Sequence, residues 1–311
     1  MITASKSIGD TDSQLEAMER HLMIIYSRAS EEIREKSDKF FTQFEKSDEK
    51  KRKEVESGKL SEEEYKKWRK NKLLYGRRFA NFRRKITHEL AVVNETALAY
   101  INGETPGVFA LNYNDMGTDI TSEVNGRFDA GISFDLVDAD TVRLLASEDR
   151  ELLPEKKLDI PKDERWNAQK MQSELMQGIM QGESIPKIAA RMKNVVGMNR
   201  DSAVRNARTM VTGAQNAGRM ESMRRAEKLG VIEEKYWMSS DQPGRTRDWH
   251  MPSAFVKLSI PIDEPFENEI GKIMHPGDQK AHPANVYNCR CTLGVKIIGF
   301  RDPATGKVRY I

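Results

Sequence analysis

Four side chains near the C-terminal end of the chain are of types that bind transition metals. His250, His282, Cys289 and Cys291 offer the nitrogen and sulfur donors that Zn²⁺ takes in proteins. The C-x-C spacing departs from the C-x₂₋₄-C spacing typical of zinc sites and is too close for an unstrained disulfide. The competing interpretation is two small, buried thiols in a strand. On the spacing we expect no metal and no other cofactor, with zinc as the alternative.

One acid–base pair is also present. Asp248 and His250 are two apart, which in a strand places both on one face and suits a general base with an orienting carboxylate. The chain contains no nucleophile elbow, no P-loop and no H-E-x-x-H pattern. We therefore predict that the protein is not an enzyme, and a transferase or nuclease module is the less favoured alternative.

Arginine, aspartate and asparagine recur in the short loops around these residues. Arg247, Asp248 and Arg290 could form an ionic network with Asp278, because a guanidinium can bridge two carboxylates. Asparagine side chains such as that of Asn288 close loops by bonding to nearby backbone. We therefore predict a structural role for this group. Its members are Arg245, Arg247, Asp248, His250, Asp278, Asn288, Cys289, Arg290 and Cys291.

A second candidate site is a basic stretch in the first third of the chain. No acidic residue interrupts residues 66–85, and aromatic residues are interleaved with the cations. A helix that contacts DNA phosphates would have this pattern, whereas the alternative is a solvated face beside a packing stripe. The candidate DNA-binding residues are Lys66, Lys67, Arg69, Lys70, Arg77, Arg78, Arg83, Arg84 and Lys85.

The basic stretch lies in a segment, residues 11–102, that is expected to be helical because it lacks proline and shows helical apolar spacing. Two helices joined near Ser57-Gly58 predict an antiparallel hairpin. Ser61 and Glu64 form a capping-box pattern at the start of the second helix, whose apolar stripe continues to Ala97.

Residues 103–311 have a different composition and are predicted to form different elements. Glycine, proline and asparagine predict loops over 103–164, with one strand near 132–137. Helices resume near Arg165; one is expected to end at Gly197 and the next to run over 200–229. The strands expected in the last segment are Tyr236–Trp237, Ala254–Val256, Thr292–Ile298 and Val308–Ile311, with a terminal hairpin at Gly306.

Composition agrees with a partly extended, helical protein. Charged residues make up 32% and hydrophobic residues 38%, against about 25% and 45–50% in typical globular chains. The formal charge is only +3, so an electrostatic partner must meet a local cluster. No stretch resembles a signal peptide or a membrane span. We predict an α+β protein with a mainly helical N-terminal half of long antiparallel helices and a smaller α+β C-terminal domain.

Four motifs in a fixed order resemble a known family. They are the small-residue, arginine-containing helix 207–219, the sequence R-T-R-D-W-H at 245–250, P-G-D at 276–278 and N-C-R-C at 288–291. This combination is similar to the Mu F-like head-morphogenesis family of tailed bacteriophages, most clearly from Ile185 to Ile298. Some relatives carry a further cysteine pair near the R-x-R-D-x-H element. This chain has no cysteine before Cys289, which argues against a four-ligand metal site of that type.

The resemblance implies a structural minor head protein that acts in capsid assembly at or near the portal. The residue patterns above predict a charged helical hairpin at 1–102 and a loop-rich connection at 103–164, and the resemblance implies a Mu F-like domain at 165–311. Portal and major capsid proteins would be partners, with double-stranded DNA as a further candidate and no membrane. This chain would be present in multiple copies per virion. The protein would be made in the host cytoplasm and carried in the virion. The alternative function is a DNA-binding packaging or ejection protein.

Overall fold

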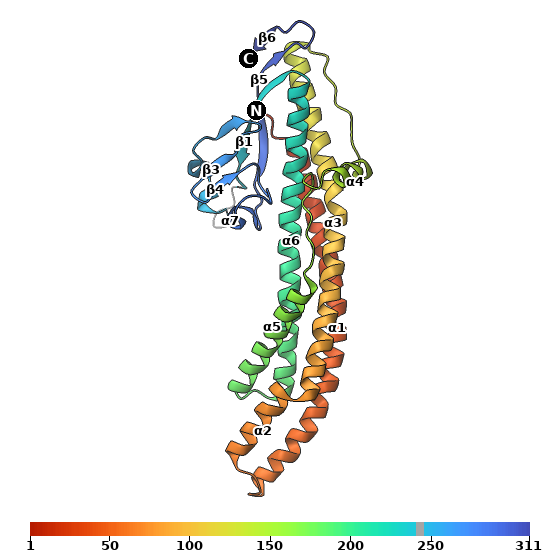
Figure 1. The fold of residues 1–311 in the computed structure, drawn as a ribbon, viewed down its shortest axis with the longest axis vertical. Coiled ribbons are helices and arrows are strands. Elements are labelled where there is room, and N and C mark those ends of the chain that lie inside the picture. Colours follow the sequence, from red (N-terminus) through yellow and green to blue (C-terminus); the bar gives the residue numbers. More distant parts are fainter. Residues whose placement is uncertain (241–245) are drawn as a thin grey trace. The chain divides into compact units, whose positions relative to one another are not determined.

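The structure is a computed structural model that describes residues 1–240 and 246–311. The helices are α1 (Ser5–Glu56), α2 (Glu62–Tyr75), α3 (Arg77–Phe128), α4 (Ala139–Glu148), α5 (Ile160–Met180), α6 (Ile185–Lys228) and α7 (Pro283–Val286), with the 3-10 helices η1 (Asp248–His250) and η2 (Pro252–Ala254). The strands are β1 (Val231–Met238), β2 (Ser259–Pro261), β3 (Phe266–Asn268), β4 (Gly271–Ile273), β5 (Thr292–Arg301) and β6 (Val308–Tyr310). Long helices with a small antiparallel sheet confirm the predicted α+β class (Figure 1).

The chain divides into two compact units, each assembled from separated segments. The sheet unit comprises Met1–Glu19, Tyr100–Lys156 and Val204–Ile311, and the helical unit comprises Arg20–Ala99 and Lys157–Ala203. Helices α1, α3 and α6 contribute residues to both units. Each of the three regions delimited from the sequence therefore supplies residues to both units.

A four-stranded antiparallel sheet, in the order β2-β1-β5-β6, forms the centre of the sheet unit. The register of β5 and β6 confirms the predicted terminal hairpin, with Phe300 opposite Arg309. One hydrophobic core joins the sheet to the ends of α3 and α6 that belong to this unit, through side chains such as Met116, Met223 and Leu293. Residues 254–256 do not form the predicted strand, because η2 occupies part of them.

The loops predicted after Gly103 are wrong for residues 103–128, which continue helix α3. Pro106 cannot donate to the carbonyl of Asn102, but the hydroxyl of Thr105 donates to that oxygen at 2.9 Å. Buried residues at helical spacing, from Thr105 through Asn112 to Ile120, fix the helix in place. Burial of one face thus outweighs the cost of an internal proline.

The strand predicted near 132–137 is also absent, since residues 129–138 belong to no helix or strand. Two asparagines of α3 bind this extended segment instead. The side chain of Asn125 bonds to both the N–H and the carbonyl of Ile132, and Asn114 does the same for Val137, at 2.8–3.0 Å. Side-chain amides here replace the partner strand that a sheet would supply.

In the helical unit, the turn at Gly58 has a positive φ of 70° and follows α1 as predicted. Ser61 and Glu64 form the predicted capping box at the start of α2. The second helix does not continue to Ala97 unbroken, because Gly76 is extended and separates α2 from α3. The predicted stop at Gly197 is likewise wrong: α6 passes through it, with Val195, Val196 and Asn199 buried.

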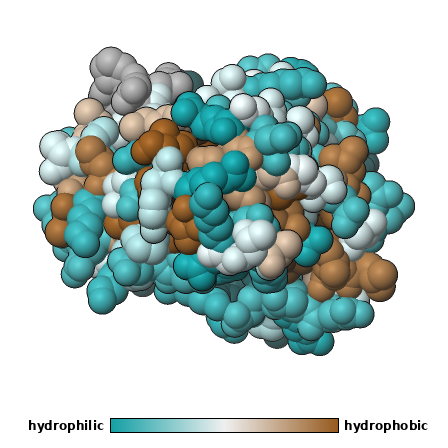
Figure 2. Space-filling model, turned by 90° about the horizontal axis from the view of Figure 1, so that it is seen from above, coloured by the Kyte–Doolittle hydropathy of each residue, from teal (hydrophilic) through white to brown (hydrophobic). Residues whose placement is uncertain are grey.

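Both hydrophobic and hydrophilic residues lie on the surface of the protein. No helix in the described part of the chain has the length and apolar character needed to cross a bilayer. Figure 2 shows hydrophobic side chains on the face seen from above interspersed with hydrophilic ones.

Candidate functional site

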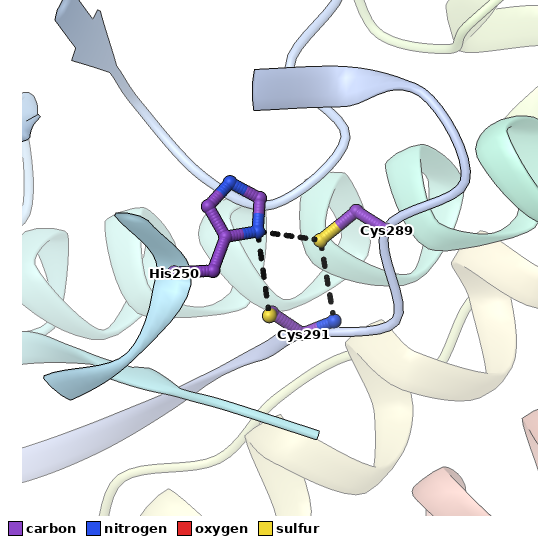
Figure 3. A group of neighbouring side chains, drawn as sticks. All are labelled: His250, Cys289 and Cys291. Atoms are coloured by element: carbon purple, nitrogen blue, oxygen red, sulfur yellow. Dashed lines mark hydrogen bonds between the residues drawn. The ribbon is translucent and has the colours of Figure 1, made fainter. Parts of the chain in front are cut away.

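Three of the four predicted donor residues meet in the sheet unit. His250 lies at the end of η1, and Cys289 and Cys291 precede β5. The Nδ1 atom of His250 is 3.5 Å from the Sγ of Cys289 and 3.8 Å from the Sγ of Cys291. All three side chains are buried, and both sulfurs face the same imidazole nitrogen (Figure 3). His282 is elsewhere: it is exposed and caps the short helix α7.

Polar residues on one face of α6 hold the cysteine segment. Thr209 accepts the backbone N–H of Asn288, which has a positive φ of 56°. Thr212 donates to the carbonyl of Cys289 at 2.6 Å. Asn216 donates to the carbonyl of Cys291 and accepts the N–H of Leu293. The backbone around both sulfurs is therefore fixed by hydrogen bonds to a helix.

Close packing explains two of the small residues in the motifs. Gly277 of P-G-D has a φ of 81°, and a Cβ there would come within 2.5 Å of the backbone nitrogen of Gly213 on α6. Only glycine fits both the left-handed conformation and the close approach. The P-G-D loop therefore docks directly on the helix that also holds the cysteines.

The loop that carries His250 is held by a second set of bonds. The amide of Asn268 donates to the carbonyl of Trp249 at 2.9 Å and bonds to Asn285. The ring of Trp237 meets the imidazole edge-on at 5.2 Å between centroids. The Nε2 atom of His250 is buried and has no hydrogen-bond partner among the described residues. The imidazole is thus fixed with Nδ1 toward the sulfurs.

The two thiols have opposite electrostatic preferences. A hydrogen bond from Cys289 and the proximity of His250 lower the pKa of the Cys291 thiol. The same thiol–thiol bond, together with burial, raises the pKa of Cys289. Ionisation is therefore favoured at Cys291 over Cys289. A thiolate is both the nucleophilic form and the metal-binding form of cysteine.

A cavity of about 330 Å³ opens beside the cluster. Its lining combines the three donor residues with three arginines and small polar side chains. The lining residues are Arg208, Ser240, Thr246, Arg247, His250, Asn288, Cys289, Arg290 and Cys291. Arg208 pairs with Glu19 at 2.6 Å. The cavity is therefore polar.

The predicted ionic loops take a different form. The carboxylate of Asp278 accepts the backbone N–H groups of Met274 and Lys280, at 3.1 and 2.9 Å. Arg247 donates to the carbonyl of Tyr287. These two residues stabilise loops through backbone bonds. Arg245 lies outside the described residues.

The acid–base arrangement predicted for Asp248 and His250 does not form. Both residues lie in the 3-10 helix η1 rather than in a strand. Asp248 is exposed, whereas His250 is buried with Nδ1 toward the cysteines. The carboxylate therefore does not orient the imidazole.

The basic stretch lies in the helical unit, on α2 and the first turns of α3. Its aromatic residues pack internally: Phe82 stacks on Phe40 at 4.7 Å, and Trp68 stacks on Phe44 at 5.8 Å. Arg69 lies 3.5 Å from the buried Asp48 and is largely enclosed. The remaining predicted cations, apart from the half-buried Arg83, are exposed. They are Lys66, Lys67, Lys70, Arg77, Arg78, Arg84 and Lys85.

Comparison with known proteins gives one family. A family model described as Phage Mu protein F like protein matches residues 169–294, which include α6 and the whole His250 cluster. The match confirms the resemblance predicted from the sequence motifs. No curated protein and no solved structure matches the chain.

Proposed function

Because residues 169–294 match the Phage Mu protein F like family, we propose that the chain is a structural minor head protein of a tailed phage that acts in capsid assembly at or near the portal. The family match is the observation that carries this proposal. The buried polar contacts that hold the motif residues support it, because they explain those residues as determinants of folding. Its partners would be the portal and major capsid proteins.

The test uses phage particles and a nonsense mutation in the gene. Mass spectrometry of purified virions should detect the full-length chain, and the mutant lysate should contain fewer or malformed heads by electron microscopy. Wild-type protein supplied from a plasmid should restore normal heads. Normal heads in the mutant, together with absence of the chain from wild-type virions, would contradict the proposal.

A second candidate function is contact with packaged DNA, favoured by the exposed basic residues of α2 and α3. Neutralised phosphates release counterions, so affinity should fall with salt by a log–log slope of roughly −0.9 per phosphate. The interleaved aromatic residues pack inside the helical unit, apart from the exposed Tyr75. Binding would therefore depend on charge and be independent of base sequence.

Duplex binding by the full chain at two salt concentrations tests this candidate. The substitutions Lys67→Gln, Lys70→Gln, Arg77→Gln and Lys85→Gln remove four exposed charges and should weaken binding strongly at low salt. The matched control removes four exposed charges from the sheet unit, with glutamine at Lys257, Lys272, Lys296 and Lys307. Equal loss in both variants, or no binding at low salt, would assign the basic residues to another role.

A further inference from the structure

The His250 cluster has the composition and geometry of a metal site with an unfilled position. We propose that His250 Nδ1, Cys289 Sγ and Cys291 Sγ bind one Zn²⁺ ion, whose fourth coordination position opens into the adjoining cavity. All three ligand atoms lie within 4.8 Å of one another, and all three side chains are buried. Two sulfurs and one imidazole form a donor set that favours zinc over magnesium or calcium.

The two nitrogen–sulfur distances fit a single tetrahedral ion. Zinc–sulfur bonds of about 2.3 Å and zinc–nitrogen bonds of about 2.0–2.1 Å place a nitrogen ligand and a sulfur ligand about 3.6 Å apart across a tetrahedral angle. His250 Nδ1 lies 3.5 Å from one sulfur and 3.8 Å from the other. Both nitrogen–sulfur distances therefore match those around a single tetrahedral ion.

A metal also explains why two sulfurs converge on one nitrogen. Nδ1 has either one proton or one lone pair, so it can make only one good hydrogen bond to two thiols. A cation between the three atoms would interact with each of them. The backbone N–H of Cys291, which points to the sulfur of Cys289 at 3.4 Å, would stabilise a metal-bound thiolate as an outer-shell donor.

The scaffold holds these ligands before any ion arrives. Thr212 and Asn216 of α6 fix the carbonyl groups of both cysteines, and Ser239 donates to the carbonyl of His250. These bonds bring together a helix, the turn before β5 and the η1 loop. Such outer contacts commonly set ligand orientation and metal affinity.

The fourth position is the feature that separates this site from a closed structural zinc site. Among the residues that the structure describes, no further histidine, cysteine or carboxylate joins the group of three. The three ligands instead line a cavity of about 330 Å³ that also contains Arg208, Arg247 and Arg290. Two thiolates would balance the charge of Zn²⁺, and the cavity leaves the remaining coordination position open. Its fourth ligand is therefore an exchangeable water or small anion.

Cobalt substitution tests the proposal on the full-length protein. Chelator-treated, reduced chain titrated with Co²⁺ should develop near-ultraviolet thiolate-to-cobalt absorption that saturates at one ion per chain. Zn²⁺ should displace the cobalt and raise the melting temperature. Cys289→Ser, Cys291→Ser and His250→Asn should each weaken zinc binding at least tenfold, whereas His282→Asn should bind as wild type does.

Two results would overturn the site. One is a wild-type protein that binds less than a tenth of an equivalent of cobalt without thiolate absorption. The other is loss of binding on His282→Asn but not on His250→Asn. The spectrum of the wild-type protein decides the matter even if a cysteine variant fails to fold. Azide tests the open position: a shift of the cobalt visible bands supports it, and an unchanged spectrum shows a closed coordination shell.

Discussion

The sheet unit and the helical unit both bury polar side chains, but they use them differently. In the sheet unit, Arg219 of α6 is fully buried and donates to the carbonyls of Thr3, Ala4 and Leu293 at 2.7–3.0 Å. Its partners are mainly backbone atoms of segments outside the helices. One helix thereby fixes both the N-terminal segment and β5.

In the helical unit, buried amides bond mainly to other side chains. Asn94 of α3 donates to Asn199 of α6 at 2.7 Å, and Asn199 donates to Asn167 of α5 at the same distance. Tyr26 of α1 donates to Asn94, and Asp163 accepts from it. These hydrogen bonds fix the register of α1, α3, α5 and α6 relative to one another. Hydrogen bonds from side chains to backbone atoms thus position irregular segments, whereas bonds between side chains align helices.

The largest expected loss of stability comes from removing the guanidinium of Arg219, which donates to backbone carbonyl groups. Arg219→Met should destabilise the protein by about 3–5 kcal/mol, because it leaves several buried carbonyl groups without donors. Urea denaturation measures the change. The matched control, Arg224→Met, removes a half-exposed arginine of the same helix whose partners are Asp263 and Glu221, and should cost less than about 1 kcal/mol. Equal losses would remove the distinction between the two positions.

A smaller loss is expected in the helical unit. Asn199→Ala should destabilise the protein by about 1–3 kcal/mol, because Asn94 and Asn167 each lose one partner. A double-mutant cycle with Asn167→Ala should show coupling above about 0.5 kcal/mol, as contacting residues do. Lys193→Ala, at an exposed position of the same helix, provides the control. Additive effects at Asn199 and Asn167 would contradict a shared network.

The smallest expected effect is a gain in stability, on Glu233→Gln. Glu233 on β1 is buried with both carboxylate oxygens unpartnered among the described residues, and burial, with Glu227 nearby, raises its pKa well above the usual range. The folded chain therefore holds a proton that the unfolded chain loses, and stability falls as pH rises above about 4.5. Glu233→Gln should stabilise the protein by about 1–2 kcal/mol at pH 7, since each pKa unit is worth about 1.4 kcal/mol.

Urea denaturation at pH 4 and pH 7 tests whether Glu233→Gln raises the free energy of unfolding. The gain should be present at pH 7 and largely absent at pH 4, where both states of the wild-type chain hold the proton. Glu234→Gln, on the less buried side of the same strand, should change stability by less than about 0.5 kcal/mol. A Glu233→Gln variant that is less stable at pH 7 would show that the carboxylate has a favourable role.

Sequence predicted the elements whose signals are local. The capping box of Ser61 and Glu64, the turn at Gly58 and the terminal hairpin near Gly306 formed as expected. The continuation of α3 beyond Gly103 could not be inferred from local residue preferences, because tertiary burial of one face decided it. The break at Gly76 and the passage of α6 through Gly197 have the same origin: a glycine permits either outcome, and packing selects one.

For the candidate site, sequence identified the donor residues but not their positions. It grouped His250 and His282 equally, and only the fold separates the buried ring from the exposed one. The polar face of α6 was missed, although Thr209, Thr212, Asn216 and Arg219 recur at helical spacing. That spacing, in a helix otherwise rich in small residues, was the available signal. Their backbone partners lie more than 70 positions away.

The side chains of Asn114 and Asn125 on α3 should determine which backbone amides of residues 129–138 are protected from hydrogen exchange. Asn125 and Asn114 accept the N–H groups of Ile132 and Val137. Residues 133–136, between these two positions, belong to no β-sheet. Amide exchange in this segment should therefore be slow at these two positions and fast at residues such as Ser133 and Asp135. Protection would follow a two-point pattern rather than the alternating pattern of a strand, because each slow amide depends on a single side chain.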